Sequence, residues 1–202
     1  MTKEEEVRRV LAGLMILIMS MVPFHVFAAS ALDMVKINAN SVLDVLRDPK
    51  LKGEAGKKVK EQKIEAAAEK LFDYVELSKR TLGLNWNKLS MDQRKEFVEL
   101  FKTLLRNTYI DRITAYTNEK VEFTKEVQLT ETTTEVQSVV TKGNTKVPIN
   151  YRVIKKGSDW MVYDVVIEGV SLISNYRTQF REILGNNPPQ VLIDTLRKRV
   201  GK

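Results

Sequence analysis

The spacing of apolar residues changes twice along the chain, and this change limits the folds that the chain can adopt. From Glu119 to Glu168 four segments alternate apolar and polar residues, which is typical of half-buried strands. The segments before and after carry apolar residues at helical spacing. Turn residues at Gly143 and Asn144, and again in "KGSD", predict an antiparallel meander for the last three strands. We therefore predict an α+β fold, with helices packed on one face of a curved antiparallel sheet.

The strongest helical signal lies in residues 90–116. Ser90 and Gln93 have the spacing of a capping box, and a continuous apolar stripe follows them. Other helices are predicted over residues 32–46, 63–83, 172–184 and 190–200. The stripe consists of Phe97, Phe101, Leu104, Leu105, Tyr109, Ile113 and Tyr116.

The first thirty residues predict an export signal. Arg8 and Arg9 precede the apolar run "VLAGLMILIMSMV", and small residues suited to cleavage follow at Ala28 and Ala29. The run is shorter than the about 20 residues that cross a membrane, which argues against an uncleaved anchor. We expect residues 1–28 to be a Sec-type signal peptide that is removed, which leaves residues 29–202 as a single domain.

Composition narrows the chemistry of the expected mature chain. The sequence has no cysteine, and its one histidine, His25, lies in the predicted signal peptide. Ser-His-Asp and Cys-His nucleophiles and the common zinc sites are therefore excluded, and we expect no enzyme activity, metal or cofactor. The formal net charge is +7. In an exported protein this charge favours membrane surfaces, anionic lipids or acidic proteins as partners over nucleic acid.

A strand-to-helix joint, "YDVVIEGVSLISNYRTQF", spans residues 163–180. Gly169 permits a sharp turn, Ser171 can cap the next helix, and Tyr176 and Phe180 line one side of that helix. The alternation also places Tyr163, Val165 and Ile167 on one face of the strand. "GVS" is not a nucleophile elbow, because Ile173 replaces the second glycine and no histidine base remains.

Charged residues near the joint have two interpretations. Asp164 and Glu168 lie about 13 Å apart along a strand, too far for a glycosidase pair, so pairing with Arg152 or Arg177 is favoured. Arg177 and Arg181 could lie at a cavity mouth near a phosphate or could simply be solvated. Four lysines, at positions 57, 58, 60 and 63, are expected to form a solvated helix face, with docking to an acidic partner as the alternative.

Several of these residues form a pattern that resembles the toluene-tolerance, MlaC-like family of periplasmic phospholipid-binding proteins of Gram-negative bacteria. The resemblance covers nearly the whole of the expected mature chain, and its most specific part is the joint. The residues that carry it are Leu82, Gly83, Trp86, Gln93, Phe97, Phe101, Leu104, Leu105, Tyr109, Tyr151, the block from Trp160 to Phe180, Leu192, Ile193 and Leu196.

The resemblance implies an NTF2-like α+β fold whose apolar cavity, between sheet and helices, holds phospholipid tails. It also implies a monomeric shuttle in the periplasm, which carries lipid between an inner-membrane ABC transporter with an MCE-domain protein and an outer-membrane lipoprotein-porin complex. Such a carrier would help to maintain outer-membrane lipid asymmetry. The resemblance implies phospholipid as cargo rather than as cofactor.

The apolar stripe alone favours a filled core, and the resemblance favours a cavity instead. On this interpretation, Val170→Glu is expected to abolish lipid binding. The alternatives are an NTF2-like isomerase or dehydratase that uses Tyr163, Asp164 and Tyr176, and an adaptor with a solid core. The expected lipid-binding wall consists of Phe97, Phe101, Leu104, Leu105, Tyr109, Tyr151, Val153, Tyr163, Val165, Ile167, Val170, Leu172, Tyr176 and Phe180. The expected head-group or joint residues are Arg152, Arg177 and Arg181.

Overall fold

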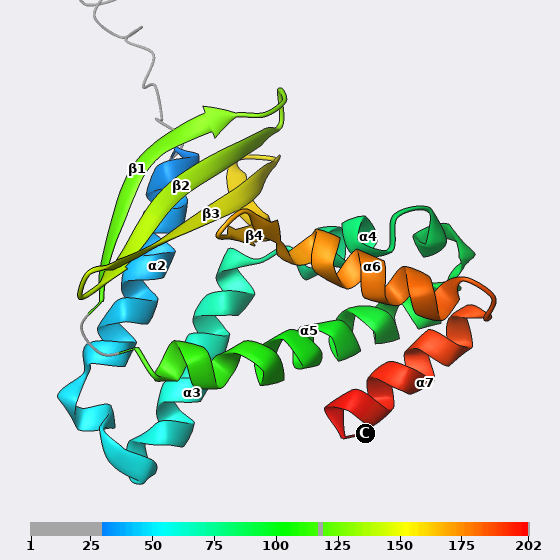
Figure 1. Cartoon of the computed structure of the whole chain (residues 1–202), viewed down its shortest axis with the longest axis horizontal. Helices are drawn as coiled ribbons and strands as arrows, with labels where there is room; N and C mark the ends of the chain where they lie inside the picture. Colours follow the sequence, from blue (N-terminus) through cyan, green and yellow to red (C-terminus); the bar gives the residue numbers. More distant parts are fainter. Residues whose placement is uncertain (1–29, 117–118, 202) are drawn as a thin grey trace, which may run out of the picture.

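The computed structural model describes residues 30–116 and 119–201, so the predicted signal peptide lies outside the described residues. Within these ranges, four α-helices precede the sheet and two follow it (Figure 1). No helix in these two ranges is both long and apolar enough to span a membrane. The helices are α2 (Ala31–Arg47), α3 (Gly53–Leu71), α4 (Tyr74–Leu82), α5 (Met91–Thr114), α6 (Leu172–Leu184) and α7 (Pro189–Val200), with short 3₁₀ turns at Pro49–Leu51 and Gly83–Lys88.

The five strands form one curved antiparallel sheet in sequence order, which confirms the predicted α+β fold and meander (Figure 1). Gly143 and Gly157 have positive φ angles in the hairpin turns, a conformation that glycine adopts without steric cost. The strands are β1 (Lys120–Gln128), β2 (Thr133–Lys142), β3 (Thr145–Lys156), β4 (Asp159–Ile167) and β5 (Val170–Ser171).

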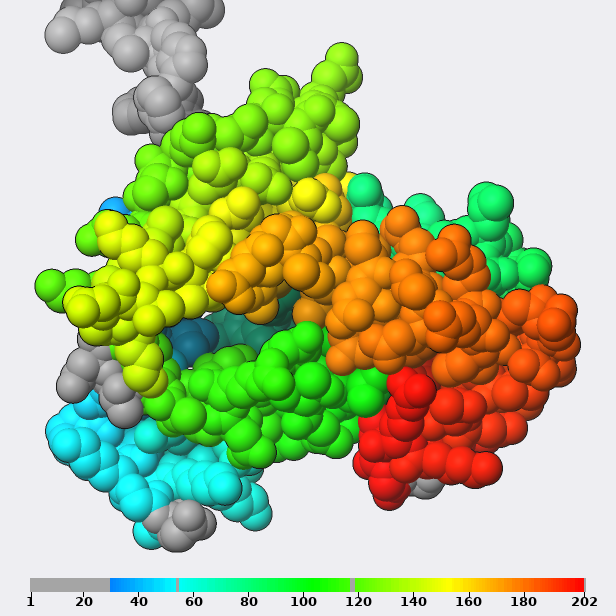
Figure 2. Space-filling view, viewed as in Figure 1, coloured from blue at the N-terminus to red at the C-terminus, as the bar shows by residue number. Residues whose placement is uncertain are grey.

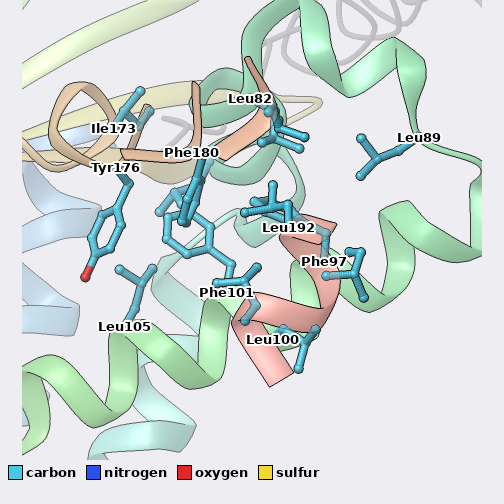
Figure 3. Packing of buried hydrophobic residues seen from close by; sticks show 14 of the residues in the cluster. Leu82, Leu89, Phe97, Leu100, Phe101, Leu105, Ile173, Tyr176, Phe180 and Leu192 are labelled. Atoms are coloured by element: carbon cyan, nitrogen blue, oxygen red, sulfur yellow. The ribbon is translucent and has the colours of Figure 1, made fainter. Parts of the chain in front are cut away.

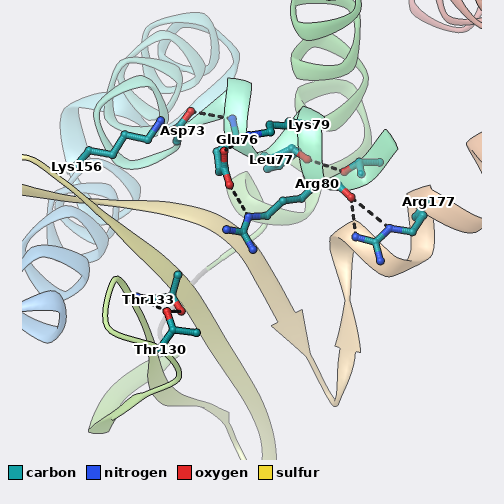
Figure 4. A network of polar contacts seen from close by, with 10 residues as sticks. Asp73, Glu76, Leu77, Lys79, Arg80, Thr130, Thr133, Lys156 and Arg177 are labelled. Carbon is teal, nitrogen blue, oxygen red and sulfur yellow. Dashed lines mark hydrogen bonds and ion pairs between the residues drawn. The ribbon is translucent and has the colours of Figure 1, made fainter. Parts of the chain in front are cut away.

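The predicted single helix over residues 63–83 is wrong, because the chain breaks between α3 and α4. Phe72 forms a parallel bridge with Val162, and the Asp73 backbone N–H donates to the Val162 carbonyl at 2.9 Å. The Asp73 carboxylate accepts from the Glu76 N–H at 2.9 Å and pairs with Lys156 (Figure 4). Asp73 therefore serves as the N-cap of α4 and ties that helix to the sheet.

Two hydrophobic clusters form the core, and Phe72 packs against both of them. The first joins α4, α5, α6 and α7, and the capping box predicted at Ser90 and Gln93 begins the helix α5 that runs through it. The second lies between α2 and the sheet, around Val35, Val136 and Val153, which are fully buried. Glu126 of β1 accepts from the Leu32 N–H at 2.9 Å and so fixes the start of α2 on the sheet.

Candidate functional site: an apolar cavity between sheet and helices

A cavity of about 420 Å³ lies between the two hydrophobic clusters, enclosed by α2, α3, α5 and the sheet. Figure 2 shows a hollow bounded by α5 in green, β3 in yellow and the orange segment that leads into α6, with blue α2 behind it. Most wall residues are aliphatic or aromatic. The helices contribute Ala39, Val42, Leu43, Leu46, Ile64, Ala68, Leu71, Leu77, Leu105, Ile110 and Ile113, and the sheet contributes Val121, Val140, Ile149, Tyr151, Val165 and Ile167.

A bulge in β4 decides which side chains of that strand face the cavity. Val153 pairs with Val162, but Arg152 pairs with Asp164, so Tyr163 is an extra residue without a partner in the register. One inserted residue reverses the alternation of side chains along a strand. Val162 therefore packs on the same face as Val165, in the cluster under α2, whereas Tyr163 packs in the cluster with α4 and α6.

The structure brings six of the fourteen predicted wall residues together at the cavity. They come from α5, β3, β4 and the first position of α6, and β1 and β2 separate the first of these segments from the other three along the chain. The lining therefore contains only part of the residues selected from the apolar stripe and the joint. The six are Leu105, Tyr109, Tyr151, Val165, Ile167 and Leu172.

Four predicted aromatic residues instead fill a solid core. Phe101 lies 5.1 Å from Tyr176 and 5.2 Å from Phe180 between ring centroids, both in edge-to-face geometry (Figure 3). Phe97 lies 5.6 Å from Phe180. The reason is the position of α6 and α7, which cover this half of α5 and leave no room for a ligand (Figures 1 and 3).

The other four predicted wall residues also lie away from the cavity lining. Val153 is fully buried beneath α2, and Leu104 packs against the aromatic cluster. Tyr163 lies under the Arg80 guanidinium, 4.1 Å from the ring centroid, because of the β4 bulge. Val170 is 62% exposed, since it follows the two-residue turn at the end of β4. The expected effect of Val170→Glu on lipid binding is not supported by this position.

The three predicted arginines also lie outside the cavity lining. Arg177 donates two hydrogen bonds to the Arg80 carbonyl, at 2.6 and 3.2 Å, and so binds the C-terminal end of α4 (Figure 4). Arg152 pairs with Glu135 at 3.2 Å and with Asp164 at 3.3 Å. Arg181 is exposed on α6. Of the four lysines expected on a solvated helix face, those at 57, 58 and 63 are exposed on α3, whereas Lys60 is half-buried.

Asp164 organises the strand-to-helix joint. Its carboxylate accepts from the Ser171 hydroxyl at 2.7 Å, from the Ile173 backbone N–H at 3.0 Å and from Arg152 at 3.3 Å, and its residue is 1% exposed. Ser171 in turn caps α6 by accepting from the Ser174 N–H. The joint therefore fixes the direction in which α6 leaves the sheet, which places Leu172 at the cavity and Tyr176 in the solid core.

Sequence reasoning missed the walls that α2 and α3 supply. Leu43 and Ile64 are buried members of the lining, and Ala39 and Ala68 are small residues that leave space. The periodicity of both helices was visible, but it does not reveal which helix face meets a void. The structure also places Arg106 and Arg112 of α5 on the cavity wall, where no arginine was predicted.

Four tyrosines, Tyr74, Tyr109, Tyr116 and Tyr151, are among the residues that line the cavity. Burial raises the pKa of Tyr151 to about 12, and a hydrogen bond with Ser138 opposes this shift. Burial, together with the nearby charges of Glu69 and Glu65, raises the pKa of Tyr74 well above its ordinary value. The pKa of Tyr109 is also raised, mainly by burial, while the charge of Arg112 opposes the shift. These phenols are therefore neutral at physiological pH.

Within residues 30–116 and 119–201 no group of three or more histidine, cysteine, aspartate or glutamate side chains could hold a metal ion. The cavity is thus mostly apolar, and its wall also carries neutral phenols, two arginines and Glu65. An enclosure of this kind can sequester an apolar molecule from water. Its size lies within the range of about 300–1,000 Å³ that is typical of ligand pockets.

Comparison with known proteins places the chain among lipid-binding relatives. The family described as "MlaC protein" matches residues 36–198. The intermembrane phospholipid transport system binding protein MlaC of Haemophilus influenzae is 26% identical over 136 residues, which are 63% of this chain and 64% of that protein. The aligned part thus spans less than two thirds of that relative.

One solved structure is similar to this chain over a larger part of its length. The phospholipid-binding protein from Ralstonia solanacearum, determined in complex with a phospholipid, has a TM-score of 0.75 and 26% sequence identity. The match covers 86% of this chain and 98% of that chain. At this level the two chains share their architecture through nearly the whole of the solved relative.

Proposed function

Since this chain belongs to the MlaC family, we propose that it is a periplasmic phospholipid carrier that encloses acyl tails in the cavity between sheet and helices. The head group would remain at the mouth, in contact with water. The observation that carries the proposal is the apolar wall shared by α2, α3, α5 and the sheet. The phospholipid bound by the Ralstonia solanacearum relative supports it.

The physical requirement for such a carrier is an interior that competes with a bilayer. Each methylene buried from water contributes about 0.8 kcal/mol, so a lipid leaves a membrane only for a comparably apolar, enclosed space. Residues such as Leu43, Ile64 and Ile110 provide that environment without a reactive group. Carriage by this means needs no catalysis.

The family and the sequence also support a proposal for the partners and the location of the protein. We place the mature chain in the periplasm, after removal of residues 1–28. There it would shuttle phospholipid between an inner-membrane ABC transporter with an MCE-domain protein and an outer-membrane lipoprotein-porin complex. This transport would maintain outer-membrane lipid asymmetry. The name of the Haemophilus influenzae relative, an intermembrane phospholipid transport system binding protein, supports this assignment.

The geometry of the alternative catalytic set argues against an isomerase or dehydratase. Asp164 is engaged by Ser171, Ile173 and Arg152 and is absent from the cavity lining. Tyr163 is covered by Arg80, and Tyr176 packs in the aromatic core. A base that is buried outside the cavity cannot reach a substrate within it.

Filling the cavity tests the proposed function. Ala68 of α3 lines the cavity, so Ala68→Trp should occupy part of the space and exclude acyl chains. Ala66 lies on the same helix but is exposed, and Ala66→Trp is the matched control. Lipid is extracted from the purified mature proteins and quantified by mass spectrometry. We expect about one phospholipid per wild-type and Ala66→Trp molecule and a loss of most lipid in Ala68→Trp.

Circular dichroism and the unfolding midpoint establish that both variants are folded. Wild-type protein that is folded and carries no phospholipid, even after incubation with phospholipid vesicles, contradicts the proposal. Equal lipid contents of folded Ala68→Trp and Ala66→Trp would show that the tails lie elsewhere.

A further inference from the structure

Helix α5 brings two arginines to the cavity wall, and they differ in their charge partners. Arg106 is paired with Glu61 at 3.2 Å and with Glu65 at 2.7 Å. Arg112 lies in the last turn of the helix, and its residue is exposed. Among residues 30–116 and 119–201 it forms no ion pair or hydrogen bond. The first guanidinium is therefore neutralised by the protein, whereas the second is available to an anion.

The other arginines near this region are committed to the protein or lie off the wall. Arg47 donates to the Tyr116 hydroxyl at 2.9 Å and to the Glu119 carbonyl at 3.4 Å. Arg152 and Arg177 are bound at the joint and at α4, respectively. In the described part of the chain, Arg112 alone combines an unpaired guanidinium with a position on the cavity wall.

The surroundings of Arg112 mark the boundary between the apolar interior and water. Tyr109 and Tyr116, one turn before and one turn after it, also line the cavity. Ile113, the next residue, lines the cavity and is 38% exposed. A ligand whose tails fill the interior would therefore present its polar end at this height of the wall.

We infer that Arg112 binds the phosphodiester of the cargo at the cavity mouth and thereby favours phosphate-bearing lipids over neutral lipids with the same tails. This inference rests on the proposed function. The planar guanidinium can donate two parallel hydrogen bonds to phosphate oxygens, a geometry that a hydroxyl head group does not match. Because the side chain is exposed, its ion pair with the phosphate contributes little to the affinity, and the buried tails supply most of it. The arginine therefore acts mainly on the choice between lipids that have the same tails.

A competition between two lipids with identical tails tests this inference. Delipidated mature protein is incubated with vesicles that contain equal amounts of palmitoyl-oleoyl phosphatidylglycerol and palmitoyl-oleoyl glycerol, and the bound ratio is measured by mass spectrometry. Arg112→Gln should lower the ratio of phosphatidylglycerol to diacylglycerol roughly three- to tenfold, as expected for one charge-assisted contact at an exposed site. Arg181→Gln removes the same charge from an exposed position away from the cavity lining and should leave the ratio unchanged.

The outcomes separate the inference from the proposed function. If wild-type protein takes up both lipids and Arg112→Gln leaves the ratio unchanged, the inference fails and the carrier function stands. An equal fall in Arg181→Gln also overturns it, because net charge would then explain the effect. Wild-type protein that takes up neither lipid overturns both.

A third arm repeats the loading in excess inorganic phosphate. Arg112 should retain its preference, since the tails hold the phosphodiester beside it. A fall of the ratio to the Arg112→Gln value would identify a site for free phosphate and overturn the inference.

Discussion

The two halves of α5 have the same apolar pattern but different surroundings. In the first half, Phe97 and Phe101 are fully buried against Phe180 and the other rings of the solid core. In the second half, Leu105, Ile110 and Ile113 border the cavity. The difference lies in what faces the helix. Helices α6 and α7 cover the first half (Figure 1), while the second half faces the sheet across the cavity. One amphipathic stripe can thus form both a solid core and the wall of a cavity.

The largest expected effect concerns the boundary of the cavity wall at β4 and β5. Val165 lines the cavity, whereas Val170 is 62% exposed five residues later. Val165→Glu should place an unpaired carboxylate against the acyl tails and reduce bound lipid to less than about a tenth of the wild-type amount. Val170→Glu should leave the lipid content unchanged, because its carboxylate remains in water.

Both variants are compared after circular dichroism has established that they are folded, and their lipid is quantified by extraction and mass spectrometry. Loss of lipid in Val170→Glu, with retention in Val165→Glu, would place the wall on the other side of the joint. Both variants replace a valine by a glutamate, so each adds the same charge and the same volume. A general effect of added charge therefore cannot produce the expected contrast.

The comparison also explains how far sequence could predict this molecule. The change of period, the capping box at Ser90 and the hairpin turns depend on local chemistry, and the structure confirms the elements they predict. The break at Asp73 was missed because its capping interaction is reinforced by distant contacts, with Val162 and Lys156. Residues that touch across 80 or more positions leave no local signal.

The candidate site was less predictable than the fold for two physical reasons. The bulge at Tyr163 inserts one residue into β4 and reverses the side-chain alternation. A prediction that assumes regular alternation along the strand misses this reversal. Apolar periodicity, moreover, reports that a helix face avoids water but not whether side chains or empty space lie opposite. For this reason Phe101 and Leu105 belonged to one predicted wall, although only Leu105 lines the cavity.

Truncating a side chain to alanine should lower the free energy of unfolding more in the solid core than at the cavity wall. Phe101→Ala removes a ring that packs against Phe97, Tyr176 and Phe180, and we expect the free energy of unfolding to fall by about 3–5 kcal/mol. Ile110→Ala should cost about 1–2 kcal/mol, because the side chain already borders a void and has fewer packing partners to lose. Urea denaturation of the delipidated proteins measures both values. Equal losses would mean that the cavity closes when it is empty.

The smallest expected effect uses the buried phenol of Tyr151 to probe the cavity side of the sheet. Burial raises its pKa to about 12, so between about pH 10 and 12 the phenol ionises in the unfolded chain and stays protonated in the folded one. The unfolded state then binds fewer protons, and stability falls as pH rises through this window. Below about pH 10 the phenol is neutral in both states, and this dependence vanishes.

Tyr151→Phe isolates that contribution, because other groups titrate equally in both proteins. We expect the alkaline loss of unfolding free energy to be smaller in the variant by about 1–3 kcal/mol, and the difference between the proteins to be constant below about pH 9. Denaturation midpoints across this range measure it. Because the ring lies on the wall, water entering an empty cavity would hydrate the phenolate and shrink the effect. A difference that stays constant up to about pH 12 would therefore indicate that Tyr151 faces water and not an apolar enclosure.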